Sequence, residues 1–485
     1  MLHKNDGRLG SREARAGRRR ALIGSLACCA VLAGAPAAAA EWEFTPRVSA
    51  GGTWTDNVTA ADSGFEESEF ITELSPGFNL GLNGPRAEMS LDYSAQALWY
   101  QDNSDFDDVY HNLFGDAVFT LMPDKFFLDA FARLDQENID PAGRVTTGNF
   151  FQTGNRTDAT IYGISPWYQD RFGDWAETLL RYRYQGVNYS DTDPTDLRVQ
   201  DSDAHSANAR LGSPEGRPGL SWGANVSYTL TEFDNDQEFE YGQAALDLGY
   251  AVGSRSRVTF TIGSESDVET DPTKGGFDET FWYVGYAWQP SQRQSLSARV
   301  GDRYYGTAFE FRWSRQGTRG ELSVDYTETP TTANQRLFDG EGTFSGGRPG
   351  APALDTGVFL SKRLTARATY NLVRTRLNAS VYAEDRERQS SSVDPVLLRD
   401  DEVWGVRLGA DWDAAARTQV NFSTRYEDRE SDGGRNSDLL ELSVSARRDI
   451  TRTFYGQLRA SHATRDFDNS GYDINAVTLS LGAEF

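Results

Sequence analysis

The sequence predicts an all-β fold, a single large antiparallel transmembrane β-barrel of about 22 strands with short periplasmic turns and long extracellular loops. Three observations support this class. Long segments alternate apolar and polar residues with period two. The connections between these segments alternate between short and long. After residue 40, no apolar run reaches the roughly 20 residues that a membrane-spanning helix needs.

The last stretch, residues 472–485, shows the alternation most clearly. Its apolar positions are every second residue, namely Val477, Leu479, Leu481, Ala483 and Phe485. An edge strand of a soluble β-sandwich is the alternative. The stretch resembles the closing strand of bacterial outer-membrane barrels, and that resemblance implies that the aromatic residue Phe485 acts as an assembly signal.

Residues 1–40 have the three parts of a secretory signal peptide. A basic region that includes Arg18, Arg19 and Arg20 precedes an apolar run over residues 21–35, and Ala-Ala-Ala at 38–40 forms a cleavage site. We therefore expect cleavage after residue 40 and a barrel over residues 41–485. A lipoprotein signal on Cys28 and a twin-arginine signal are weaker alternatives.

The two cysteines of the chain, Cys28 and Cys29, both lie in this leader. The mature chain is then expected to lack thiols, which excludes disulfides, thiolate metal sites and a cysteine nucleophile. The formal net charge of −24 argues against nucleic acid as a partner, because binding phosphates requires a basic surface.

The length of the alternating segments separates a membrane barrel from a soluble sheet. Residues 87–100, 220–230 and 404–412 alternate throughout, and the segments run to roughly 10–14 residues, whereas soluble strands have a mode of about 5–6. Aromatic residues near the segment ends are expected to form interfacial girdles, namely Trp99, Tyr100, Trp222, Trp404 and Trp412.

The predicted turns and loops differ in length and in charge. Short connections are expected at residues 83–86, 122–125, 171–174, 251–257, 289–293, 315–318, 371–375, 413–417 and 447–451, and they are basic. Long ones include residues 135–157, 190–203, 265–278, 328–356 and 385–401. Acids are assigned to the loops, among them Asp102, Asp107, Asp203, Glu427 and Asp428. These acids are either simply solvated or bind divalent cations that bridge lipid phosphates or polysaccharide.

The polar face of the strands is expected to line the lumen. The residues proposed there are Arg181, Arg183, Gln185, Arg299, Arg407, Gln457 and Arg459, together with Glu88, Asp92, Asp116, Asp129 and Asp247. Such a mixed-charge surface either pairs with itself across strands or forms a polar conduit with a transverse field. The long segments 135–157 and 328–356 are expected to fold inward as constrictions.

The sequence offers little catalytic chemistry, and we expect no enzyme activity, no catalytic residue, no cofactor and no metal site. After the leader the histidines are His111, His205 and His462, and neither a G-x-S-x-G nor an H-E-x-x-H motif is present. Acid pairs such as Asp107-Asp108 and Asp400-Asp401 lie among other acids, so nothing raises the pKa of one carboxyl selectively.

Several short motifs resemble one family of barrels, the PEP-CTERM system-associated outer-membrane proteins. They are W-T-D-N-V at 54–58, L-S-P-G-F at 74–78, the block R-Y-Y-G-T at 303–307 followed by F-R-W-S-R at 311–315 and L-S-V-D-Y-T-E at 322–328, and F-L-S-K-R-L at 359–364. The resemblance implies a porin-like barrel of the bacterial outer membrane linked to exosortase sorting and exopolysaccharide. It carries over no functional residues.

Taken together, these features predict a porin-like or export-associated conduit. A structural or adhesive barrel that presents acidic loops is the alternative, and a barrel enzyme acting on lipid or glycan is a third reading. The expected partners are outer-membrane lipid and lipopolysaccharide, the barrel assembly machinery and exopolysaccharide or its export proteins.

Overall fold

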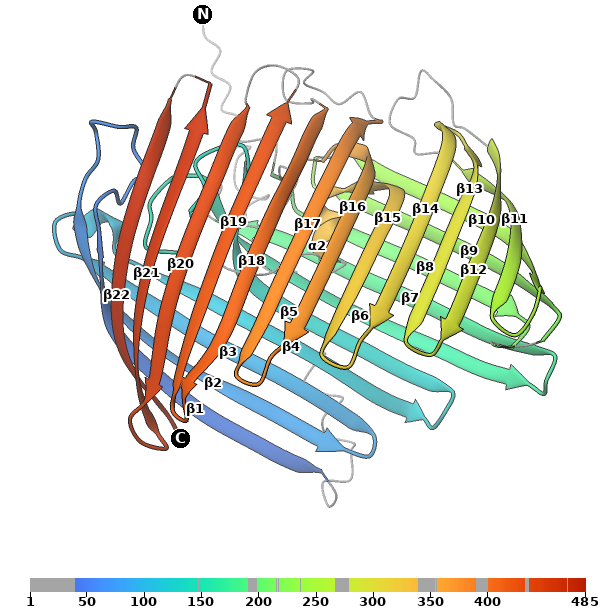
Figure 1. Ribbon diagram of the computed structural model, residues 1–485, viewed down its shortest axis with the longest axis horizontal. Helices are drawn as coiled ribbons and strands as arrows, with labels where there is room; N and C mark the ends of the chain where they lie inside the picture. Colours follow the sequence, from blue (N-terminus) through green and yellow to red (C-terminus); the bar gives the residue numbers. More distant parts are fainter. Residues whose placement is uncertain are drawn as a thin grey trace, which may run out of the picture.

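A computed structural model describes residues 40–485 except 147, 191–198, 215, 217, 236, 267–278, 339–353, 355, 390–399, 432–435 and 469. The predicted leader and parts of the predicted loops lie outside the described residues. Twenty-two strands form one closed antiparallel sheet, which confirms the predicted class and strand number. Each strand pairs with the next, and β1 closes the ring on β22 from Arg47↔Glu484 to Thr55↔Ala476 (Figure 1).

The strands of the first half are β1 (Glu41–Thr55), β2 (Glu69–Gly84), β3 (Ala87–Tyr100), β4 (Asp108–Met122), β5 (Phe126–Asn138), β6 (Arg156–Phe172), β7 (Ala176–Ser190), β8 (Ser202–Gly212), β9 (Leu220–Phe233), β10 (Glu238–Ala251) and β11 (Ser256–Ser266). Those of the second half are β12 (Glu279–Ser291), β13 (Gln294–Arg303), β14 (Gly306–Gln316), β15 (Gly320–Thr332), β16 (Val358–Asn371), β17 (Thr375–Arg388), β18 (Asp401–Ala415), β19 (Thr418–Ser431), β20 (Ser437–Asp449), β21 (Phe454–Phe467) and β22 (Gly471–Glu484). The described helices are short: the 3-10 helix η3 (Ser104–Phe106) and α2 (Ala333–Phe338). No helix in the described part of the chain is long and apolar enough to cross a membrane.

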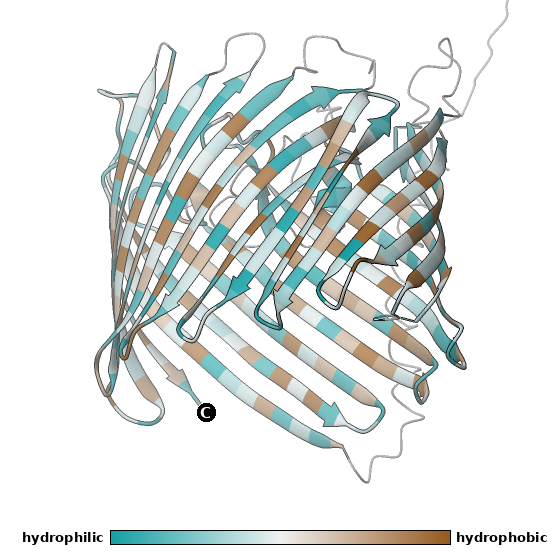
Figure 2. Cartoon of the chain, turned by 45° about the vertical axis from the view of Figure 1, so that its right-hand side comes forward, coloured by the Kyte–Doolittle hydropathy of each residue, from teal (hydrophilic) through white to brown (hydrophobic). Residues whose placement is uncertain are grey.

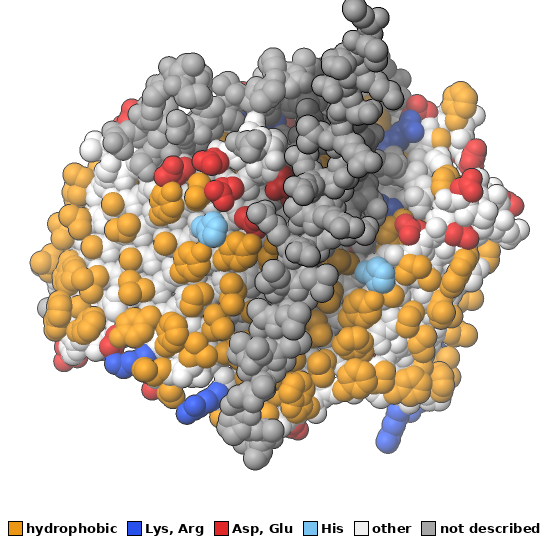
Figure 3. All heavy atoms as spheres, turned by 180° about the vertical axis from the view of Figure 1, so that it is seen from behind, with side chains coloured by type: hydrophobic (Ala, Val, Ile, Leu, Met, Phe, Trp, Pro, Cys, Tyr) orange, Lys and Arg blue, Asp and Glu red, His pale blue; other side chains and the backbone are white. Residues whose placement is uncertain are grey.

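The outer surface of the barrel carries a wide apolar belt. Alternate residues of each strand point outward, and many are large and exposed, such as Leu246 at 59% and Leu479 at 61%. Figure 3 shows hydrophobic side chains spread over one outer face, with most of the visible acidic side chains toward the top of the view and several basic side chains at its lower edge. Exposing so much apolar surface to water is unfavourable by about 25 cal/mol per Å², whereas hydrocarbon removes this cost. The belt therefore faces lipid. Figure 2 shows the hydrophobic and hydrophilic residues interspersed along the strands.

The two ends of the barrel differ as the sequence predicts, with exceptions. At the periplasmic end most turns are short, but the connection between β8 and β9 spans residues 213–219. At the extracellular end three connections are short, at residues 234–237, 304–305 and 468–470, so the alternation of short and long is not strict. In one periplasmic turn Lys125 donates a hydrogen bond to Asp170 at 2.8 Å, which raises the pKa of the Lys125 ammonium.

The interior of the extracellular half is filled by loops. We name three of them by their place in the order: L1 (residues 56–68), L3 (139–155) and L8 (333–357, which contains α2). Val58 of L1 packs against Ile71 and Leu98, and Phe151 of L3 packs against Tyr472 and Ile474. Leu337 and Phe338 of α2 pack against Ile161 and Val187. The barrel therefore buries an apolar core inside the ring at this end, where these loops occupy part of the lumen.

One residue that the sequence predicts in the aromatic girdles, Tyr100, does not lie there. Tyr100 is only 4% exposed and points inward, where its hydroxyl donates to the carbonyl oxygen of Phe150 at 2.9 Å. Its neighbour Trp99 is 45% exposed on the outer surface. Because adjacent strand residues point to opposite faces, the two cannot both belong to the girdle.

Candidate functional site

The inner wall of the barrel is the candidate functional surface, and its charges pair between adjacent strands or across one intervening strand. Arg47 on β1 makes a bidentate contact with Asp92 on β3, with both Nη–Oδ distances at 2.6 Å. Arg181 on β7 contacts Asp129 on β5 and donates to Ser165 at 2.8 Å. Arg299 on β13 contacts Glu310 on β14. Each pair is partly exposed to the lumen, so the pairs order the wall and leave it polar.

The structure also locates the other residues proposed to line the lumen. Asp247 accepts hydrogen bonds from Thr261 at 2.6 Å and from Asn225. Arg459 donates to Ser443 at 3.3 Å, and Arg407 stands directly opposite Arg425 across the β18–β19 ladder. Four others lie on inward-facing positions of their strands, as strand pairing shows: Glu88, Asp116, Arg183 and Gln185.

A buried ion-pair network on the inner face of β17–β20 was missed from the sequence. Glu384 contacts Arg386 at 2.9 Å, and Asp401 joins Arg386 at 2.6 Å to Arg429 at 2.7 Å. Glu427 contacts Arg425 at 2.8 Å. The side chains of these arginines and of Glu384 and Glu427 are at most 6% exposed.

Several of these residues lie in strands, although the sequence predicts them in loops. Strand β17 continues through Arg388, and Glu427 lies inside β19 rather than in an acidic loop. The predicted loop boundaries at residues 135, 203 and 328 are likewise too wide, because β5, β8 and β15 extend further. A usable signal was present in the alternation itself: Glu384-x-Arg386-x-Arg388 and Arg425-x-Glu427-x-Arg429 keep period two. The high density of charged residues in both segments favours a prediction of solvated loops.

Helix α2 is attached to two nearly opposite sides of the ring. Arg336 contacts Glu384 on β17 at 2.7 Å. Asn334 donates to Ser202 on β8 at 2.8 Å and accepts from the Tyr189 hydroxyl on β7 at 2.7 Å. Figure 1 shows α2 within the ring, behind β16 and β17. The described part of L8 therefore bridges the lumen, whereas residues 339–353 and 355 of the predicted constriction lie outside the described residues.

L3 crosses the lumen in another direction. Where L3 enters β6, Arg156 donates to the carbonyl oxygens of Gly148 at 2.7 Å and Phe151 at 2.5 Å. Far along the chain, Tyr472 donates to the carbonyl oxygen of Val145 at 2.6 Å. Arg465 donates to the carbonyl oxygen of Pro141, also at 2.6 Å. L3 therefore reaches from β5–β6 to β21–β22 and roofs that part of the lumen.

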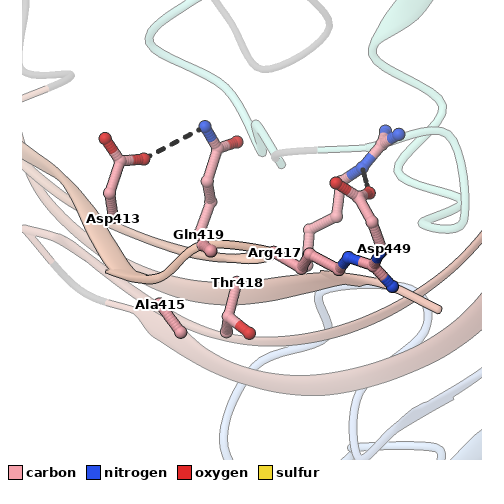
Figure 4. A pocket seen from close by; sticks show the side chains of 8 residues that line it. Asp413, Ala415, Arg417, Thr418, Gln419 and Asp449 are labelled. Atoms are coloured by element: carbon pink, nitrogen blue, oxygen red, sulfur yellow. Dashed lines mark hydrogen bonds and ion pairs between the residues drawn. The ribbon is translucent and has the colours of Figure 1, made fainter. Parts of the chain in front are cut away.

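Two cavities open from the polar wall. One of about 260 Å³ lies beneath L3, against β1–β4 and β21–β22. The other, of about 450 Å³, lies at the periplasmic turns of β18–β20, where Gln419 donates to Asp413 and Arg447 donates to Asp449 (Figure 4). Both cavities combine charged and amide side chains, which suits hydrated solutes.

The three histidines lie on the outer surface. His111 shares a hydrogen bond with the Tyr93 hydroxyl at 2.9 Å, His205 with Tyr182 at 2.7 Å, and His462 with the Asn475 side chain at 2.9 Å. Figure 3 shows histidine side chains near the acidic margin of the apolar belt. Within the described ranges no three His, Cys, Asp or Glu side chains are grouped as metal ligands. The structure thus places the histidines away from the polar lumen.

The known proteins that this chain is similar to are solved structures of other barrels. No protein-family model and no curated protein matches the sequence. A ferric enterobactin receptor (PfeA) mutant from Pseudomonas aeruginosa is similar with a TM-score of 0.48 and 9% identity, covering 91% of this chain and 80% of that one. The siderophore receptor PirA from Acinetobacter baumannii is similar with a TM-score of 0.47 and 9% identity, covering 91% of this chain and 80% of that one. A loop-deletion mutant of OmpT, an outer membrane protein of Vibrio cholerae, is similar with a TM-score of 0.33 and 8% identity, covering 92% of this chain and 100% of that one. The closed 22-stranded ring and its lipid-facing belt make this chain a β-barrel of the bacterial outer membrane.

Proposed function

We propose that the barrel is a porin-like or export-associated conduit whose lumen is constricted by L3 and L8. The observation that carries the proposal is the bridge made by α2, which contacts β8 through Asn334 and β17 through Arg336. A barrel of 22 strands is wide enough to conduct unless something fills it. Here the filling segments are loops held by side-chain hydrogen bonds and ion pairs, which can rearrange without unfolding the wall.

The polar wall supports solute passage rather than a purely structural role. Charged and amide side chains continue below the constriction to the periplasmic turns, where the second cavity lies. A barrel that served only to display loops would need no polar cavities along its inner face. The alternative, an adhesive barrel, draws on the acidic extracellular margin seen in Figure 3.

Single-channel recording in planar lipid bilayers tests the proposal. The wild-type barrel should give small, stable conductance steps. A variant in which residues 141–152 are replaced by a four-residue Gly-Ser linker should conduct several times more, because the roof over one part of the lumen is removed. A well-folded barrel that stays silent in both forms contradicts the conduit and favours the adhesive alternative. Deleting residues 333–353 should then abolish surface binding.

We further propose that the conduit serves the PEP-CTERM sorting and exopolysaccharide system. The motifs at 54–58, 74–78 and 303–328 support this assignment by resemblance. A chromosomal deletion should reduce the amount of secreted polysaccharide or of sorted surface protein, and expression from a plasmid should restore it. Unchanged levels of both in the deletion strain would separate this barrel from that system. We also propose lipopolysaccharide and the barrel assembly machinery as partners, which the lipid-facing belt supports.

A further inference from the structure

The cavity beneath L3 has an unusual chemical composition. It is bounded by strands from both sides of the β1–β22 closure and roofed by residues 148–150 of L3. Its volume of about 260 Å³ equals that of about nine waters at ~30 Å³ each. A space of this size holds one small polar ring with its substituents.

The lining is polar and nearly neutral. It contains one carboxylate, that of Glu73, and one guanidinium, that of Arg459. The remaining polar groups are amides and hydroxyls, and the apolar contribution comes from the rings of Phe150 and Tyr455. No aliphatic Ala, Val, Leu, Ile or Met side chain belongs to the described lining. A lipid or an apolar peptide would find no complementary surface, and a polyanion would meet only one positive charge.

Several of these polar groups are available for a ligand. The side-chain amides of Asn112 and Gln457 make no hydrogen bond to the described part of the chain. Gln96 accepts a hydrogen bond from Asn149 at 3.0 Å through its oxygen, which leaves its NH₂ group directed elsewhere. Ser49 and Ser480 add two hydroxyls. Amides and hydroxyls each offer both a donor and an acceptor within one short side chain.

The roof of the cavity is fixed by Asn149, which is only 4% exposed. Its NH₂ group donates to Gln96 and to Gln136, each at 3.0 Å. Its oxygen accepts from Arg156 at 2.9 Å. All three bonds join L3 to the wall, so the cavity exists before any ligand arrives. A preformed site avoids the entropy cost of ordering its groups on binding.

From these contacts we infer that the cavity is a binding subsite for one neutral sugar unit of a saccharide chain. Sugar hydroxyls both donate and accept hydrogen bonds, which matches the amides of Asn112 and Gln457. The C–H faces of a sugar ring are apolar and match the aromatic ring of Phe150, whereas the Arg447 guanidinium already lies over the Tyr455 ring at 3.6 Å from its centroid. This inference rests on the proposed conduit, whose solute it specifies as a neutral saccharide.

Maltohexaose is a suitable neutral probe, added to single channels from the periplasmic side. Wild type should show transient blockades whose frequency rises with sugar concentration. Gln457→Ala should weaken blockade roughly 2- to 10-fold, the loss expected for one hydrogen-bonding side chain, and the Asn112→Ala/Gln457→Ala double variant should weaken it further. Gln294→Ala is the matched control, because Gln294 lies on the same outward face of β13 as Val300, lines neither cavity and should leave blockade unchanged.

The outcomes separate this inference from the conduit. Steady current without any blockade by maltohexaose overturns the sugar subsite and leaves the conduit standing. Titration calorimetry on the detergent-solubilised barrel measures sugar binding without current, so a silent channel that still binds maltohexaose through Gln457 retains the subsite and removes the conduit. Tighter binding of trigalacturonate than of maltohexaose would assign the cavity to acidic sugars through Arg459 and overturn the neutral class.

Discussion

At the scale of single residues, Gly77 shows how the wall accommodates its ion pairs. Arg47 on β1 reaches across β2 to Asp92 on β3 at 2.6 Å, and Gly77 stands between them, opposite Arg47 and Ser94. A Cβ atom at this position would lie 2.5 Å from the carbonyl oxygen of Tyr93 and 3.1 Å from Nε of Arg47. A glycine is therefore required by close approach, and it belongs to the L-S-P-G motif.

We predict that Gly77→Ala lowers the free energy of unfolding by about 1–3 kcal/mol, because the added methyl group overpacks the β2–β3 contact. Urea unfolding in detergent micelles, followed by tryptophan fluorescence, measures the change. Gly81→Ala is the control on the same face of the same strand, where a Cβ atom would meet nothing closer than 3.7 Å. Equal losses in the two variants would show that crowding at Gly77 is not the cause.

At the scale of elements, the ion-pair network decides where α2 sits. Glu384 receives Arg336 from α2 at 2.7 Å and Arg386 from its own strand at 2.9 Å, and its side chain is fully buried. Removing one charge from a buried pair costs about 3–5 kcal/mol, since the arginines keep their charge without compensation. The helix itself has only six residues and cannot be stable alone.

We therefore expect Glu384→Gln to release α2 from β17 while the barrel stays closed. Trypsin should then cleave after Arg336, which is 7% exposed in the intact protein, at least about ten times faster than in wild type. Mass spectrometry of the fragment ending at Arg336 reports the cleavage. Glu310→Gln makes the same chemical change at the Arg299 pair, away from α2, and should leave the rate unchanged. Protection of Arg336 in Glu384→Gln would mean that apolar packing of Leu337 and Phe338 suffices.

At the scale of the whole molecule, closure of the ring brings the first strand, β1, beside the last strand, β22. The Phe485 amide donates to the carbonyl oxygen of Pro46 at 3.0 Å, whereas the Phe485 side chain is 68% exposed on the outer surface. The backbone of this residue thus serves closure, whereas its ring lies on the outer surface, and we propose that this ring is recognised during assembly.

Phe485→Ala should accordingly lower the amount of barrel in the outer membrane several-fold, and change the free energy of unfolding of the purified protein by no more than about 0.5 kcal/mol. Immunoblotting of membrane fractions and urea unfolding measure the two effects. Phe454→Ala removes a ring of similar exposure, 54%, from the neighbouring strand and should keep the wild-type level. A normal level for Phe485→Ala would remove the role of assembly signal.

Closure also predicts resistance to detergent. An unheated sample in sodium dodecyl sulfate should migrate differently on a gel from a boiled one, because every strand is paired on both sides and the sheet has no free edge to open. Identical migration, or solubility of the purified chain without detergent, would contradict a barrel whose outer surface meets lipid.

Much of the wall could be predicted from the sequence, because successive side chains of a strand point alternately outward and inward. Whether a residue faces lipid or the lumen therefore depends on whether its position in the strand is odd or even. The outward Trp404 and inward Arg407 follow from period two alone. The misplacement of Tyr100 shows where composition overrode that rule, since an aromatic residue beside Trp99 suggested a girdle. The wrong prediction of a loop at Glu427 has the same origin, because a high density of charge usually indicates exposure to solvent.

The local alternation of this sequence by itself determines a large antiparallel barrel, its two surfaces and its approximate strand number. Only the tertiary structure decided what fills the lumen. Arg465 meets the carbonyl oxygen of Pro141, and Tyr472 meets that of Val145, each more than 300 residues away along the chain. The physical reason is that a loop has no period to read, and its partners are chosen by which strands the closed ring brings within hydrogen-bonding distance.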